Sequence, residues 1–321
     1  TSNYYVLGYY IDETWDGKYH EIRVEVRQKG LQAHAQGGYF NAKPFTEFSK
    51  FEKQLHLVDL ALNKNPYFQE PLPFPVIALP CSEKKQSNFI LLSEIALEEL
   101  GDAARGKTEL VTFIFDKDKN VTYSMRGESD FSQLPQKTVY FYTISSLSPG
   151  QYDCRVVIRN LETGEAALAS TSINIPEAVE GGLRCHPPLL LIPDKKSYYL
   201  KLTVEEKKTE EKKAPSIADI YPFLSNEHSP LVETADRKAS KLLAIAPVSI
   251  SNLAEPEIEV TAYLIQHEKG EKIPLPLSIL ASEHKEETYV LLLETELPEL
   301  KPGNYSLQIC AADVKSGAKS D

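Results

Sequence analysis

The chain has 321 residues, of which 42% are hydrophobic, and it carries a formal net charge of −11. It is long enough for two or three domains of ordinary size, and its apolar fraction is that of a globular protein. The negative charge argues against nucleic acid as a partner. The sequence has no apolar run of about 18 residues, so no membrane-spanning helix is predicted.

Residues 1–64 are predicted to form a β-meander and a helix. Residues 4–11 are apolar on both faces of an extended strand, and residues 21–27 alternate with the period of a half-buried strand. The dipeptides Asp16-Gly17 and Lys29-Gly30 are typical of the turns that join such strands. A chain that opens inside a strand is expected to be a mature or trimmed product.

The clearest helix is predicted at the end of this segment. Ser49 can cap its first turn, because Glu52 follows three residues later, and Asn65-Pro66 ends it. Its apolar side chains are expected to cover another part of the molecule. This apolar stripe, with spacings of three and four residues, consists of Phe48, Phe51, Leu55, Val58 and Leu62.

Two series of short strands follow, one in residues 65–180 and one in residues 181–321. Each series is predicted to form an immunoglobulin-like or fibronectin-like β-sandwich, so the fold class is mainly β with two sandwiches in tandem. The strands predicted for the first series are 73–79, 89–96, 109–115, 121–125, 138–145, 152–159 and 167–175. Those predicted for the second series are 198–204, 242–245, 258–266, 273–280, 288–294 and 305–312.

A repeated motif links the two series. Residues 147–152 and 300–305 both follow the pattern Leu-x-Pro-Gly-x-Tyr, and an alternating strand follows each of them. Pro-Gly predicts a turn between sheets, and the tyrosine is expected to return its hydroxyl to the backbone of the preceding corner. Tyr152 and Tyr305 are therefore predicted to form the tyrosine corners of two duplicated sandwiches.

The four cysteines are widely spaced, without a Cys-x-x-Cys pair or the spacing of a zinc site. Cys154 lies two residues after Tyr152, where antibody-like domains place the second cysteine of their disulfide, and Cys81 is a candidate partner. The equivalent position of the second copy is Leu307, which favours a buried free thiol at Cys154. The sequence is compatible with either state.

The N-terminal segment carries a composite motif. Residues 5–9 read Tyr-Val-Leu-Gly-Tyr, a hairpin follows from Asp16-Gly17-Lys18, and the segment closes on Gly38-Tyr39-Phe40. This series resembles the end of the bacterial von Willebrand factor A-related domain found in Acidobacteria, although Gln36-Gly37 stands where a basic residue usually falls. The resemblance implies that the opening strand is the tail of an α/β domain. The metal site of that family needs an Asp-x-Ser-x-Ser motif, and residues 130–134 lack its second serine.

No catalytic, cofactor-binding or metal-binding residues are predicted. The seven histidines are scattered, and the sequence has no nucleophile elbow, phosphate loop or dinucleotide-binding fingerprint. The run Asp116-x-Asp118-x-Asn120 begins like a calcium loop but lacks the central glycine and the closing glutamate, so a Lys-rich turn explains it better.

The sequence favours a non-enzymatic structural or interaction protein in the extracellular space, at the cell surface or in the periplasm. In one version the chain assembles into a surface filament, because a free strand with two apolar faces can add to the sheet edge of another copy. The partner is then a protein, either a second copy or another surface protein. The alternative is an adhesion module that binds carbohydrate or peptide. The residues predicted for strand exchange are Tyr4, Tyr5, Val6, Leu7, Tyr9 and Tyr10.

Overall fold

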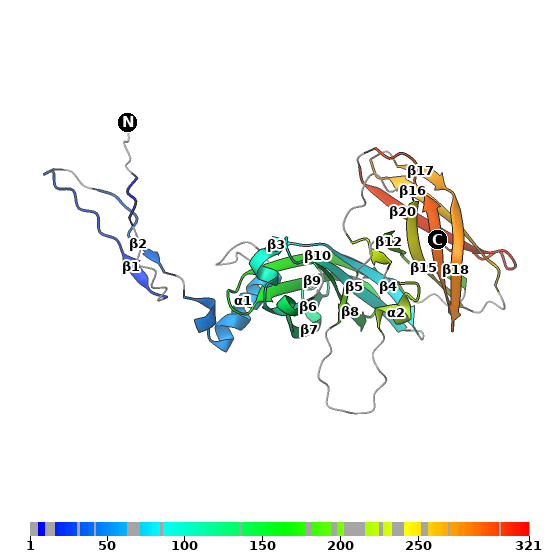
Figure 1. Cartoon of the computed structure of the whole chain (residues 1–321), viewed down its shortest axis with the longest axis horizontal. Helices are drawn as coiled ribbons and strands as arrows, with labels where there is room; N and C mark the ends of the chain where they lie inside the picture. Colours follow the sequence, from blue (N-terminus) through cyan, green and yellow to red (C-terminus); the bar gives the residue numbers. More distant parts are fainter. Residues whose placement is uncertain are drawn as a thin grey trace, which may run out of the picture.

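A computed structural model shows a mainly β protein with several sheets, as predicted (Figure 1). Its helical elements are the 3-10 helices η1 (Phe45–Glu47), η2 (Gly101–Ala104) and η3 (Phe131–Gln133), and the α-helices α1 (Lys50–Leu62) and α2 (Ile217–Ile220). The structure describes residues 6–9, 17–30, 33–41, 43–62, 71–83, 86–134, 137–177, 182–193, 198–201, 216–224, 227–232, 241–251, 256–268, 270–301 and 303–320.

The N-terminal segment contains only two short strands among its described residues. β1 (Tyr19–Glu21) and β2 (Gly38–Phe40) pair antiparallel and form a two-stranded arm that projects from the rest of the molecule (Figure 1). The predicted strand at residues 21–27 is wrong beyond Glu21, because residues 22–26 lie in no strand, although the Ile22 amide still donates to the Gly37 carbonyl at 2.9 Å. Of the predicted strand at residues 4–11, residues 6–9 are in no strand, and the rest lie outside the described residues.

Helix α1 begins as predicted and packs with an unexpected face. Ser49 and Glu52 form the reciprocal capping pair, with the Ser49 amide 2.7 Å from Glu52 Oε2 and the Glu52 amide 3.2 Å from Ser49 Oγ. The sheet below it buries Leu57, Leu60 and Ala61, not the predicted apolar stripe. Three side chains of that stripe are instead exposed: Phe51, Leu55 and Val58.

The first β-unit consists of two facing sheets. The first sheet has the strand order β3-β10-β9-β6-β7 and the second sheet has the order β13-β8-β5-β4. The seven predicted strands of the first series are all present, as the strands from β4 to β10. The unit comprises β3 (Leu72–Pro73), β4 (Val76–Glu83), β5 (Gln86–Ala96), β6 (Lys107–Phe115), β7 (Val121–Asp130), β8 (Thr138–Ser146), β9 (Gly150–Asn160) and β10 (Ala166–Ile175).

The second β-unit also consists of two sheets. The third sheet has the order β14-β12-β15-β19-β18, with β11 also paired to β15, and the fourth sheet has the order β17-β16-β20. One strand from this part of the chain, β13, pairs parallel with β8 and so belongs to the second sheet. The strands are β11 (Gly182–Cys185), β12 (Leu189–Pro193), β13 (Tyr198–Lys201), β14 (His228–Pro230), β15 (Lys241–Ser251), β16 (Ile258–Gln266), β17 (Glu271–Leu275), β18 (Leu277–Lys285), β19 (Thr288–Glu296) and β20 (Tyr305–Asp313).

Among the described residues, three large apolar cores lie between the four sheets, and smaller apolar clusters lie under α1 and against the fourth sheet. Phe89, Leu91 and Phe141 face the first sheet, whereas Ile90 and Leu92, the alternate residues of β5, face the third sheet and α2. The second sheet is therefore buried on both faces, which explains why its strands read as nearly continuous apolar runs. The third and fourth sheets enclose the last core, with Ile309 and Ala311 contributed by β20.

Candidate functional site

The two predicted tyrosine-corner residues make the same contact in both β-units. The hydroxyl of Tyr152 donates to the Ser148 carbonyl at 2.9 Å, and the hydroxyl of Tyr305 donates to the Lys301 carbonyl at 3.1 Å. In each unit the tyrosine therefore ties its strand to the backbone four residues upstream. A net hydrogen bond of this kind contributes about 1 kcal/mol, so its role here is local stabilisation.

The turn that follows each of these strands is also repeated. Asn160 ends β9, and its side-chain oxygen accepts from the amides at positions 162 and 163. Asp313 ends β20, and its carboxylate accepts from the amides at positions 315 and 316, as well as from the Ser316 hydroxyl. The Ser316 hydroxyl is the main reason why the pKa of Asp313 is lowered. These contacts stabilise the turns and leave little of either side chain for a ligand.

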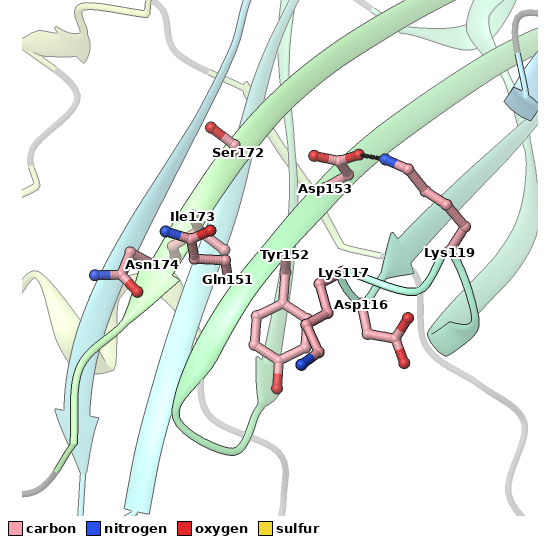
Figure 2. Close-up of a pocket in the computed structure, with 9 residues that line it drawn as sticks. All are labelled: Asp116, Lys117, Lys119, Gln151, Tyr152, Asp153, Ser172, Ile173 and Asn174. Atoms are coloured by element: carbon pink, nitrogen blue, oxygen red, sulfur yellow. Dashed lines mark hydrogen bonds and ion pairs between the residues drawn. The ribbon is translucent and has the colours of Figure 1, made fainter.

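A hollow opens beside Tyr152, at one end of the first sheet (Figure 2). It has a volume of about 260 Å³, and strands β9 and β10 form one wall while the loop after β6 forms the other. Lys119 pairs with Asp153 across it. Its lining consists of Asp116, Lys117, Lys119, Gln151, Tyr152, Asp153, Ser172, Ile173 and Asn174.

The carboxylate of Asp116 is already used within its own loop. It accepts from the amides of Asp118 and Asn120 and from the Asn120 side chain, at 2.8 to 3.1 Å. The Asn120 side chain is the largest cause of the lowered pKa of Asp116. Lys119 occupies a left-handed conformation, with φ of 65°. The loop is thus a turn that is stabilised by its own hydrogen bonds. The carboxylate of Asp116 accepts from backbone amides of the loop, whereas in a calcium loop it would bind the cation.

A buried charged cluster under α1 is the largest feature that sequence reasoning missed. Glu109 and Arg159 are 0% and 1% exposed, and Arg159 Nη2 lies 2.5 Å from Glu109 Oε2. Arg159 also donates to the Lys53 carbonyl at 2.6 Å and lies 3.3 Å from His56 Nδ1. Burial, and secondarily the charge of Arg159, lower the pKa of His56 to about 4.

This cluster holds α1 onto the first sheet. Arg155, on the same face of β9 as Arg159, donates to the Ala61 carbonyl in the last turn of the helix. The sequence shows that arginines alternate with core residues along β9. This alternation points to α1 as the partner of the arginines only when the structure shows that α1 covers their face of the strand. Because the cluster is closed to solvent, we assign it to structure.

The predicted strand-exchange residues that the structure describes are exposed. Val6, Leu7 and Tyr9 keep 87%, 70% and 55% of their surface accessible. Tyr4, Tyr5 and Tyr10 lie outside the described residues. In Figure 1 the N-terminal end of the chain lies at the arm, away from the sheets. An isolated two-stranded hairpin is marginally stable in water, so the arm is expected to gain stability from a further strand.

The cysteines that could form a disulfide lie in separate cores. Cys154 packs between the first and second sheets, and Cys81 packs on the opposite face of the second sheet. Both are buried and neither is in a disulfide, and burial raises the pKa of Cys154 to about 12. A thiol with so high a pKa carries almost no thiolate at neutral pH, so Cys154 acts as a small apolar side chain.

Within the part of the chain that the structure describes, no three His, Cys, Asp or Glu side chains are placed to hold a metal ion. Helices there are also too short or too polar to cross a membrane. Comparison with models of known protein families and with curated proteins gives no match.

Proposed function

We propose that this chain is a non-enzymatic, extracytoplasmic interaction protein that assembles by strand exchange. In this proposal two immunoglobulin-like sandwiches form the body, and the N-terminal segment, the tail of a von Willebrand factor A-related domain, supplies the exchanged strand. The partner is a second copy, and the product is a surface filament. The observation that carries the proposal is the exposure of Val6, Leu7 and Tyr9 on an arm that projects from the sheets.

The strand orders support the immunoglobulin-like part of this proposal. The first β-unit pairs a three-strand series β8-β5-β4 with a four-strand series β10-β9-β6-β7, which is how seven strands divide in such sandwiches. The second unit repeats the strand that starts near the corner tyrosine and the turn after that strand. Such sandwiches carry unrelated functions, so the interaction role rests on the arm alone.

Physical reasoning favours strand addition at the arm. An exposed strand has unpaired amides and carbonyls as well as apolar side chains, and pairing with a sheet edge satisfies both. Burying three largely exposed side chains would contribute several kcal/mol at about 25 cal/mol per Å². The net charge of −11 opposes association by repulsion between copies, so the assembly is expected to strengthen with salt.

The test compares the chain with its Leu7→Lys variant by light scattering after gel filtration, over a wide range of protein concentration. The wild type is expected to form concentration-dependent oligomers, and the variant is expected to remain monomeric. Val314→Lys is the matched control, because Val314 is 53% exposed but lies in the turn after β20. A wild-type chain that is monomeric at every concentration would refute the proposal.

The hollow beside Tyr152 supports a second candidate, an adhesion module that binds a carbohydrate or a peptide. Gln151, Asn174 and Lys117 line it with hydrogen-bonding groups, and Tyr152 adds an aromatic ring (Figure 2). Its volume of about 260 Å³ is smaller than the roughly 300–1,000 Å³ of most small-molecule sites. A glycan array tests this candidate, with Tyr152→Ala as the variant that should lose any signal.

A further inference from the structure

Helix α1 has two apolar faces on opposite sides. The inner face is buried against the first sheet. The outer face carries four apolar residues, which we call the outer stripe: Phe51, Leu55, Val58 and Leu62. The first three of these side chains keep 69%, 47% and 42% of their surface accessible, and Leu62 is half-buried. A helix that is apolar on both faces normally lies inside a larger core, so the outer stripe is expected to be covered when the protein is assembled.

The spacing of the outer stripe fits a second helix. Its members are separated by four, three and four residues, which is the repeat that keeps one side of a helix in contact with its partner in a coiled coil. Phe48 would extend this repeat, but it lies before the helix and packs against Phe45 and His56 instead. Over residues 51–62 the stripe is about 17 Å long, so a helix of similar length is the partner that it fits.

The chain itself supplies such a helix. Among the described residues, α1 is the only helix longer than four residues, so the matching helix is α1 of a second copy. In an antiparallel pair, Phe51 of one copy lies opposite Leu62 of the other. Leu55 then lies opposite Val58, so each larger side chain meets a smaller one. Antiparallel packing also places each helix N-terminus beside the partner's C-terminus, which the helix dipoles favour.

We propose that the outer stripe of α1 packs antiparallel against the outer stripe of a second copy and so joins filaments side by side. This inference rests on the proposed function, which supplies the filament. A single contact is too small to hold two free monomers, because the stripe offers on the order of 300 Å², whereas a stable interface buries about 800 Å² on each partner. Along a filament every copy repeats the contact, so weak contacts add to a stable pairing.

Carboxylates along one side of the outer stripe oppose this contact. Glu52 and Asp59 are seven residues apart and therefore lie on the same side of the helix. In the antiparallel pair, Glu52 of one copy lies near Asp59 of the other, and these like charges repel. Lys43 compensates part of the charge, because its Nζ lies 3.1 Å from Glu52 Oε2. The side-by-side pairing should therefore strengthen with salt.

The mass per unit length of the filaments, measured by electron microscopy, tests the contact. Wild-type filaments should be paired, and Leu55→Lys should give single filaments with about half the mass per unit length. Because Leu55 is exposed, this variant should fold like the wild type, which circular dichroism checks. Gln54→Lys is the matched control, since it makes the same change of charge at a neighbouring exposed position outside the stripe. Its filaments should remain paired.

Asp59→Lys tests the antiparallel direction of the pair. The new lysine would lie near Glu52 of the second copy, so repulsion becomes attraction, and the paired filaments should persist at lower salt than those of the wild type. Glu283→Lys makes the same change of charge at an exposed position of β18 and should not have this effect. If both variants act equally, the cause is the net charge of the molecule and the antiparallel contact is wrong.

The remaining outcomes distinguish this inference from the proposed function. If the wild type forms only single filaments, or if Leu55→Lys leaves them paired, only this inference fails. The outer stripe would then have another occupant, such as a lipid surface or a helix of a different protein. If the wild-type chain never associates, both the inference and the proposed function fail.

Discussion

The burial of His56 should make the folded protein less stable toward unfolding on mild acidification. It is 6% exposed, and burial beside Arg159 lowers its pKa from 6.5 to about 4. Between these two pH values the unfolded chain binds a proton at this histidine that the folded chain does not bind. The stabilising contribution is therefore fully present above pH 6.5 and is lost as the pH falls toward 4.

The size of the effect follows from the two pKa values. Lowering the pH from about 7.5 to about 5 should cost roughly 2 kcal/mol of the free energy of unfolding through His56 alone. His186, which is 7% exposed and whose pKa is also lowered to about 4 by burial, should add a similar loss. Together they would remove a large share of the marginal stability of a typical domain.

Urea unfolding followed by circular dichroism at both pH values measures this loss. His56→Gln removes the titrating group, so the variant should lose roughly 2 kcal/mol less than the wild type between the two pH values. His34→Gln is the control, since His34 is exposed and lies on the N-terminal arm, outside the cluster under α1. If His56→Gln loses as much stability on acidification as the wild type, the buried neutral histidine is not the cause.

Two further substitutions test the packing of α1 and its surroundings. Among the described residues, Arg159→Met leaves buried Glu109 with half-exposed Arg126 as its ion-pair partner, so urea unfolding should show a loss of about 3–5 kcal/mol, and adding Glu109→Gln should recover part of it. An unchanged stability would show that the pair is solvated. Gly164→Ala places a methyl group 2.6 Å from the Phe45 ring at φ of +79°, whereas Gly106→Ala, at φ of +65°, meets no atom within 4 Å. Gly164→Ala should therefore lower the unfolding midpoint more than Gly106→Ala, and equal effects would contradict this packing.

The sequence predicted the strands of the first unit closely, because their alternation and the turns between them are local signals. The helix start at Ser49 was also predicted correctly, since the capping pair of Ser49 and Glu52 depends on only four consecutive residues. The buried face of α1 was predicted wrongly because it depends on the sheet below. On that sheet the buried pair of Glu109 and Arg159 holds the helix through the Lys53 carbonyl. The helix therefore packs with a face other than the one that carries the most apolar stripe.

The second unit was harder to predict because its pairings are distant in sequence. The predicted single strand at residues 273–280 is wrong, because the structure has two strands there, β17 and β18, separated by Pro276. β17 belongs to the fourth sheet and β18 to the third. The strands β11, β12 and β14 have five or fewer residues, too few to show a period. No sequence pattern indicated that β13 would pair with β8, because a parallel pairing between strands of different units produces no motif in the residues near either strand.

The second sheet, which is buried on both of its faces, has a consequence for how the molecule comes apart. Opening the first unit would expose Ile90 and Leu92 on one face of β5 and Phe89 and Leu91 on the other, so neither core can melt alone. β13 strengthens this link, because the second half of the chain contributes a strand to the sheet of the first. Heating should therefore give one calorimetric transition for both units, and a pull along the long axis would meet a single mechanical element without an intervening hinge.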